Sequence, residues 1–173
     1  MTRRLTRRVL IASTLLAAGA AIAQAPSSRP IKLVVPFGAG TTTDIVGRTL
    51  ADALGRQLGQ AVIVENKPGA GGAIGSEQVA KSGTDGQTLL LGTVGTHAIN
   101  PSLYKRLAYQ PLRDFAPLGF IGATPTLLVV PTASPWKSVA DLRQAGDAAV
   151  NFASAGNGTS GHLAGELLNV RLG

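Results

Sequence analysis

Apolar runs alternate with amphipathic stretches along most of this 173-residue chain. Residues 31–35, 61–64 and 88–92 form apolar runs with little polar alternation, which is typical of strands buried on both faces. Between these runs, apolar residues recur at every fourth position in 44–58, and 73–81 has the pattern of a shorter helix. The order strand, helix, strand, helix, strand predicts a parallel sheet with helices on both faces, and therefore an α/β fold.

A second and shorter α/β pattern follows an irregular, proline-containing stretch. We place a domain boundary at 122–126, so that 24–124 form a first lobe and 125–173 form the beginning of a second. Ser138 and Asp141 have the spacing of a capping box, which predicts a helix start. The remaining elements that the pattern predicts are strands at 115–121, 127–130 and 150–153, a helix at 139–145 and a final helix after residue 162.

The first 23 residues have the pattern of a bacterial export signal, which predicts a periplasmic protein. Four arginines precede the apolar stretch 9–23, which ends in small residues with two overlapping A-x-A sites, and we expect cleavage after Ala23. The Arg7-Arg8 pair also resembles a twin-arginine signal, so the Sec and Tat routes both stay open. A retained membrane anchor is the alternative, although a spanning helix needs about 20 apolar residues.

Charge and cysteine content exclude several classes of protein. The net charge is +7, and removing the four signal arginines leaves +3, spread along the chain rather than gathered in one stripe. This distribution gives little support to nucleic-acid binding. The chain has no cysteine, which excludes disulfides and thiolate-bound metal, and it contains no HExxH motif. We therefore predict no metal site and no cofactor.

Two Gly/Thr-rich loops carry the candidate chemistry: the first loop, 36–44, and the second loop, 154–162. Each lies between a predicted strand and a predicted helix, and the start of a helix offers unpaired N–H groups at the positive end of its dipole. Neither loop matches a dinucleotide fingerprint, a P-loop or a G-x-S-x-G nucleophile turn. The pair predicts a protein that holds a small anion from two sides. For Asp44, capping of its helix and contact with the ligand both stay open.

The two histidines leave a second class of protein open. His97 and His162 each lie in or beside a Gly/Thr-rich loop, so a secreted hydrolase or transferase with one of them as the base is the alternative hypothesis. A triad of Ser160, His97 and Asp44 can be assembled on paper, but their spacing does not require it. A non-functional remnant is a third possibility. We predict a binding protein without catalytic residues.

Five short motifs in a fixed order resemble a known family. They are Pro36-Phe37-x-x-Gly40-x-x-x-Asp44, VENKPGAGG at 64–72, DGQTLL at 85–90, GTHAINP at 95–101 and SAGNGTSGHL at 154–163. The chain from about residue 29 to 168 is identified as a member of the Bug family, the periplasmic solute receptors of tripartite tricarboxylate transporters. The resemblance implies a type II, Venus-flytrap periplasmic binding fold. It also implies a monomer that holds a small carboxylate between two lobes and delivers it to membrane permease subunits.

The resemblance also implies which residues bind the ligand. In the family, the first and second loops approach the ligand carboxylate from opposite lobes, partly through ordered water. The implied ligand-binding residues are Phe37, Gly38, Gly40, Asp44, Thr93, Thr96, Ser154, Asn157, Thr159 and Ser160.

Two departures from the family pattern affect these expectations. The family's first loop usually reads Pro-Gly-Gly where this chain has Ala39-Gly40-Thr41, so the backbone can approach the ligand differently. Family members are also longer than this chain, which implies that the second lobe is incomplete here. We therefore expect this polypeptide alone to lack a closed, full-affinity cleft.

Overall fold

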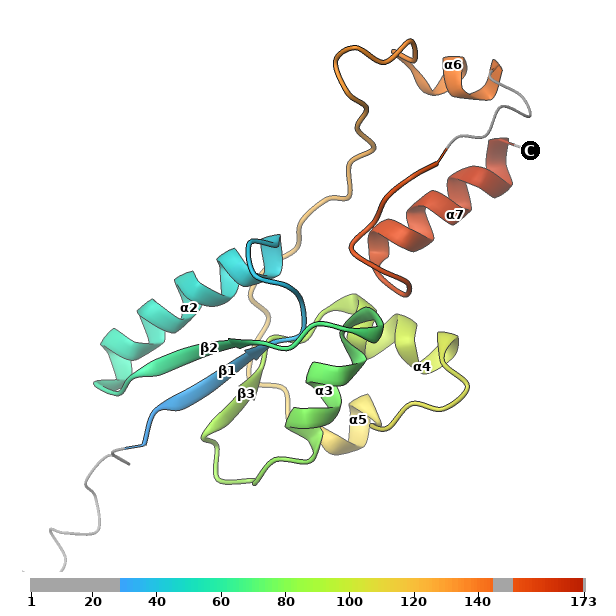
Figure 1. The fold of residues 1–173 in the computed structure, drawn as a ribbon. Helices are drawn as coiled ribbons and strands as arrows, with labels where there is room; N and C mark the ends of the chain where they lie inside the picture. Colours follow the sequence, from blue (N-terminus) through green and yellow to red (C-terminus); the bar gives the residue numbers. More distant parts are fainter. Residues whose placement is uncertain (1–28, 145–150, 173) are drawn as a thin grey trace, which may run out of the picture.

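Three parallel strands form the centre of the computed structural model, which describes residues 29–144 and 151–172. The strands are β1 (Ile31–Val35), β2 (Val62–Asn66) and β3 (Thr88–Leu90), in the order β2-β1-β3. Helix α2 (Thr42–Leu58) connects β1 to β2, and α3 (Ala73–Ala80) leads from β2 towards β3. Because the two connections run in opposite directions across the sheet, α2 and α3 cover opposite faces (Figure 1). The predicted βαβαβ unit is confirmed.

The core of this unit lies where α2 packs on the sheet. Leu33, Val35, Ala51 and Leu91 are buried together, with Val46 and Leu50 of α2 packed against them. Gly47 brings α2 close to the sheet, because a Cβ at this position would lie 2.8 Å from Val35 Cγ2. The central strand β1 is accordingly the most buried strand, as its continuous apolar run predicts.

Helix α2 begins two residues before the predicted start because Thr41, not Asp44, is its N-cap. The Thr41 side chain accepts a hydrogen bond from the N–H of Asp44, at 3.4 Å. The helix ends at Gly59, which has a left-handed φ of 63°. Strand β2 is also shifted from the prediction, since its pairing with β1 continues to Asn66.

Short helical turns follow β2 and β3. They are the 3₁₀ turn η2 (Ala70–Gly72), the π-helical turn η3 (Gly95–Ile99), α4 (Asn100–Leu103) and α5 (Pro111–Asp114). Proline lies in the first turn of both α4 and α5, where its missing N–H costs no hydrogen bond. The turns η2 and η3 come directly after the carboxyl ends of β2 and β3, and this is the edge at which open α/β sheets bind ligands.

The strands predicted at 115–121 and 127–130 are wrong. Both segments have no regular secondary structure, and Leu118, Phe120 and Leu127 are 83%, 86% and 74% exposed. An apolar run becomes a strand only when a neighbouring strand takes up its N–H and C=O groups. The three-stranded sheet of the described residues does not pair with either segment.

The remaining predicted elements have mixed outcomes. The helix predicted at 139–145 is α6 (Val139–Gln144), and its capping box is confirmed, since Ser138 and Asp141 exchange hydrogen bonds of 2.9 and 3.2 Å. Residues 151–153 are not a strand, and the rest of that predicted strand lies outside the described residues. The final helix is α7 (Ser160–Leu172).

Two predictions concern parts of the chain that the fold does not test. The export signal, 1–23, lies outside the described residues, and the domain boundary at 122–126 stays a prediction. Within 29–144 and 151–172, none of the helices has the length and apolar character needed to cross a membrane.

Candidate ligand-binding site

The first and second loops meet at one pocket near the carboxyl ends of the strands. The pocket has a volume of about 380 Å³. Three segments of the chain and Tyr104 line it: Phe37, Gly38, Thr41, Pro68, Gly69, Ala70, Gly71, Gly72, Tyr104, Ala155, Gly156 and Asn157. Figure 1 shows the turn before α7 next to the turns that follow the strands. Segments more than 100 residues apart in the sequence therefore share one lining.

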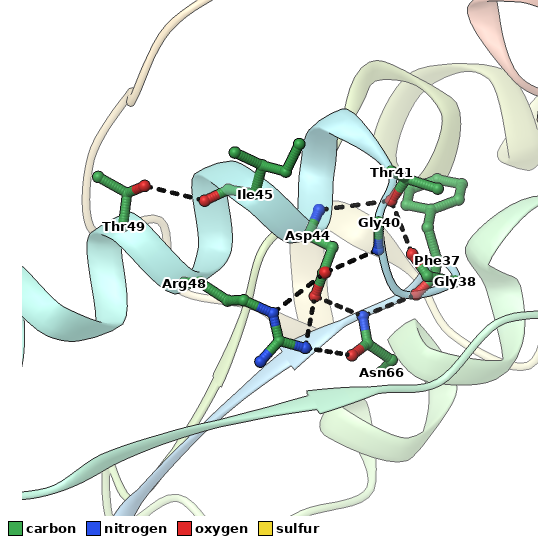
Figure 2. Close-up of polar contacts among 9 residues, drawn as sticks. All are labelled: Phe37, Gly38, Gly40, Thr41, Asp44, Ile45, Arg48, Thr49 and Asn66. Carbon is green, nitrogen blue, oxygen red and sulfur yellow. Dashed lines mark hydrogen bonds and ion pairs between the residues drawn. The ribbon is translucent and has the colours of Figure 1, made fainter.

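The first loop is a tight turn that delivers the chain from β1 into α2. The Thr41 hydroxyl donates to the Gly38 carbonyl oxygen at 2.8 Å and accepts from the Asp44 N–H at 3.4 Å (Figure 2). Gly40 has a φ of +81°, a conformation that L-residues rarely adopt. The second glycine of the predicted loop is therefore required by the turn.

Asp44 lies behind the first loop, with its carboxylate fully occupied by protein donors. It is 3% exposed and accepts hydrogen bonds from Gly40 N–H at 2.8 Å, Arg48 Nε at 3.1 Å and Asn66 Nδ2 at 2.9 Å (Figure 2). Asn66 also donates to the Phe37 carbonyl oxygen, at 3.1 Å. The Arg48 hydrogen bond, followed by those of Gly40 and Asn66, lowers the Asp44 pKa to about 2. The carboxylate therefore holds the loop in place.

The second loop repeats the geometry of the first. The Thr159 hydroxyl donates to the Gly156 carbonyl oxygen at 2.7 Å and accepts from the His162 N–H at 3.3 Å. Gly158 has a φ of +83°, close to the +81° of Gly40. The spacing Gly-x-Gly-Thr therefore encodes the same capped turn before α2 and before α7, although the sequences around the two turns differ.

Both helix starts retain the electrostatics of an anion site. In a capped helix, the N–H groups of the first two helical positions have no intrahelical acceptor. These positions are Thr42 and Thr43 in α2, and Ser160 and Gly161 in α7. Each helix also has the positive end of its dipole at this point. The loops that lead into these two helix starts both line the pocket, although the four residues themselves do not.

The predicted ligand-binding residues fall into three groups. Phe37, Gly38 and Asn157 line the pocket, whereas Gly40, Asp44 and Thr159 shape the loops behind it. The four others do not line the pocket: Thr93, Thr96, Ser154 and Ser160.

The threonines near residue 95 form a buried network beneath the pocket. Thr96 is fully buried, and its Oγ1 accepts from the Thr93 N–H at 2.9 Å. The same oxygen lies 2.8 Å from His97 Nδ1.

In the second loop, Ser154 Oγ accepts from the Gly156 N–H at 3.3 Å. These hydroxyls are thus engaged with neighbouring protein groups.

Sequence reasoning missed one wall of the pocket, residues 68–72 together with Tyr104. The glycine run at 69–72 was quoted in a family motif, but no role was assigned to it. The glycine run itself was the sequence signal for this wall, because Gly69, Gly71 and Gly72 all have positive φ values, which favour glycine. A side chain at Gly71 would place its Cβ 2.3 Å from the Asn157 carbonyl oxygen, so this glycine allows the two backbones to meet.

The histidines lie outside the pocket. The His97 ring packs against Phe115 and Tyr109, with ring centroids 5.0 and 6.5 Å apart, and burial lowers its pKa. His162 Nε2 lies 3.7 Å from Glu166 Oε1. Neither imidazole lines the pocket that the loops form.

The structure does not form the catalytic triad of Ser160, His97 and Asp44. The Asp44 carboxylate accepts hydrogen bonds from Arg48 and Asn66, while His97 Nδ1 faces Thr96. Within the part of the chain that the structure describes, no group of three or more His, Asp or Glu side chains is arranged to hold a metal ion.

The fold and the position of the pocket define a class, the periplasmic binding proteins. The periplasmic binding protein BugD has a similar structure, with a TM-score of 0.72 and 38% identity over 83% of this chain and 49% of that chain. A structure titled "R. palustris Rpa4515 with adipate" matches with a TM-score of 0.65 and 41% identity, over 68% of this chain and 40% of that chain.

Sequence comparison gives the family. Residues 46–173 match the model of the tripartite tricarboxylate transporter family receptor. Protein BugT of Bordetella pertussis is 39% identical over 150 residues, which cover 84% of this chain and 46% of BugT. The chain belongs to this receptor family, and the predicted resemblance is confirmed. It spans about half the length of the curated relatives that it matches.

Proposed function

We propose that this chain is the carboxylate-binding part of a receptor for a tripartite tricarboxylate transporter. The observation that carries the proposal is that the two loops leading into the capped starts of α2 and α7 line one pocket, whose lining, among the described residues, has no charged side chain. An anion in such a pocket is held by oriented backbone N–H groups and helix dipoles.

The pocket residues take different parts in this proposal. The side-chain amide of Asn157 supplies a polar contact, and Phe37 and Tyr104 supply apolar surface. The Thr41 hydroxyl shapes the first loop, since its proton is donated to the Gly38 carbonyl oxygen. Asp44 positions the first loop and does not touch the ligand, because its charge would repel a carboxylate and its oxygens already accept hydrogen bonds. The donors lie within 42–43 and 160–161, and ordered water bridges them to the ligand.

The remaining parts of the function follow from this role. The protein is exported through its N-terminal signal and acts in the periplasm, with a first lobe at 24–124 and the beginning of a second at 125–173. It works as a monomer, without enzymatic activity, and delivers its ligand to membrane permease subunits. The hydrolase alternative has no support in the geometry, since neither His97 nor His162 lines the pocket.

Thermal denaturation of the purified chain with adipate tests the proposal, with the neutral diamide adipamide as a control of the same length. A ligand at ten times its dissociation constant stabilises the folded state by about 1.4 kcal/mol. We expect adipate to raise the melting temperature at millimolar concentration, and adipamide to leave it unchanged. Asn157→Ala should weaken the response, whereas the exposed Asn151→Ala should not.

Equal responses to adipate and adipamide would contradict recognition of a carboxylate. A micromolar or tighter dissociation constant would contradict the expectation that the chain lacks a closed cleft.

A further inference from the structure

Asn100, at the start of α4, is buried between two walls of the pocket. The side chain has no exposed surface. Its Nδ2 donates to the Gly71 carbonyl oxygen at 3.1 Å and lies 3.5 Å from the Tyr109 hydroxyl, which in turn donates to the Thr96 carbonyl oxygen at 2.6 Å. Because a carbonyl only accepts hydrogen bonds, the Gly71 contact fixes which way the amide points.

The other end of this amide faces the second loop. Asn100 Oδ1 is buried and has no hydrogen-bond partner among the described residues. A Cβ added at Gly158 would lie 2.7 Å from this oxygen. The Gly158 carbonyl oxygen would in turn lie 3.1 Å from a Cβ at Gly95. The backbone of the second loop therefore lies directly against Gly71, Gly95 and Asn100.

We propose that Asn100 is a positioning residue that fixes the second loop against the glycine turn at 69–72, and so sets the separation of the α2 and α7 starts. Its Nδ2 donates to the Gly71 carbonyl oxygen of that turn, and its Oδ1 is available to accept a hydrogen bond from an N–H of the second loop. A buried carbonyl oxygen without a partner is unfavourable, so the amide favours arrangements in which the second loop closes on it.

The twin loops supply a matched pair of variants. Gly158→Ala and Gly40→Ala place alanine at nearly the same positive φ, so both carry a similar backbone strain. At Gly40 the added methyl group meets nothing within 4 Å, whereas at Gly158 it lies 2.7 Å from Asn100 Oδ1 and 2.9 Å from Cδ2 of the exposed Leu103 side chain. A difference between the two variants therefore reports these two contacts, and the double variant with Asn100→Ala separates Asn100 from Leu103.

The absence of cysteine allows this difference to be measured as a distance. Spin labels are attached at Gln57→Cys on α2 and Asn169→Cys on α7, both exposed, and the distance distribution is recorded by pulsed electron paramagnetic resonance. We expect Asn100→Ala and Gly158→Ala to broaden the distribution and to lengthen its mean by about 1 Å or more, the movement needed to restore ordinary contact. Gly40→Ala should change the distribution less than Gly158→Ala does, and the surface control Asn151→Ala should leave it unchanged.

A double variant separates positioning from a general loss of structure. If the two groups act on each other, adding Gly158→Ala to Asn100→Ala should produce little further change. Additive changes, or equal distributions for Gly40→Ala and Gly158→Ala, would overturn the proposal. If Asn100→Ala does not fold, the two glycine variants are compared in a Leu103→Ala background, where Asn100 Oδ1 is the close contact that remains at Gly158. The inference deepens the proposed carboxylate binding, but the distances are recorded without ligand, so the two proposals fail separately.

Discussion

Replacing Gly72 with alanine tests the close packing that forms the floor of the pocket. Gly72 has a φ of +86°, and its added Cβ would lie 2.6 Å from Thr96 Cγ2 and 3.2 Å from Phe37 Cζ. The left-handed backbone costs an L-residue about 1–2 kcal/mol. Forcing a methyl group into filled space costs a further 1–3 kcal/mol or so. We therefore expect Gly72→Ala to lower the free energy of unfolding by about 2–5 kcal/mol.

Gly59→Ala is the matched control, because Gly59 also has a positive φ, of +63°, but its added Cβ would meet nothing within 4 Å. Gly59→Ala should lower the free energy of unfolding only by the cost of the left-handed backbone, about 1–2 kcal/mol. Urea unfolding followed by far-ultraviolet circular dichroism gives both values, provided that the slope with urea stays the same. Equal losses for the two variants would refute the argument that contact with Thr96 and Phe37 requires glycine at position 72.

Three further predictions concern stability. Because the Asp44 pKa is lowered to about 2 from 3.8, its contribution to stability should be complete above pH 3.8 and lost as the pH falls towards 2; urea midpoints should show this loss, and Asp44→Asn should reduce it. Burial lowers the His97 pKa, so stability should fall as the pH drops below 6.5, and a midpoint that does not change with pH would count against this. Leu33→Ala in the core should cost about 2–5 kcal/mol in the same assay, whereas the fully exposed Leu112→Ala should change stability by less than about 0.5 kcal/mol.

The sequence predicts the βαβαβ unit well because its signals are local. The apolar run at β1 (Ile31–Val35) is sufficient to identify this strand, and the recurrence of apolar residues at every fourth position is sufficient to identify α2 (Thr42–Leu58). The start of α2 was misplaced by two residues because Thr41 and Asp44 both suit a helix start. Only the hydrogen bond from the Asp44 N–H to the Thr41 hydroxyl distinguishes the cap from the first-turn acid.

The predicted strands at 115–121 and 127–130 failed because pairing is not a local property. Their apolar side chains match a strand pattern, but no strand of the sheet in the described residues pairs with them. Likewise, the glycine run at 69–72 indicates an unusual backbone without indicating its neighbour. The approach of Gly71 to Asn157, 86 residues further along the chain, comes from tertiary structure alone.

The candidate site was predicted in outline. The two Gly/Thr-rich loops were recognised as leading into helix starts, and Phe37, Gly38 and Asn157 line the common pocket. Thr93 and Thr96 were carried over from the family motif, and they lie in a buried network instead of on the lining. A sequence motif marks residues that are needed together, but it does not separate those that touch a ligand from those that support them.

The most direct measurement of the central claim follows the backbone amides of the ¹⁵N-labelled chain while adipate is added. The account predicts that amide signals at both helix starts, Thr42 and Thr43 in α2 and Ser160 and Gly161 in α7, shift along one common saturation curve. Adipamide should shift none of them. Shifts confined to one helix start, or equal shifts with the neutral diamide, would show that the two starts do not hold a carboxylate together.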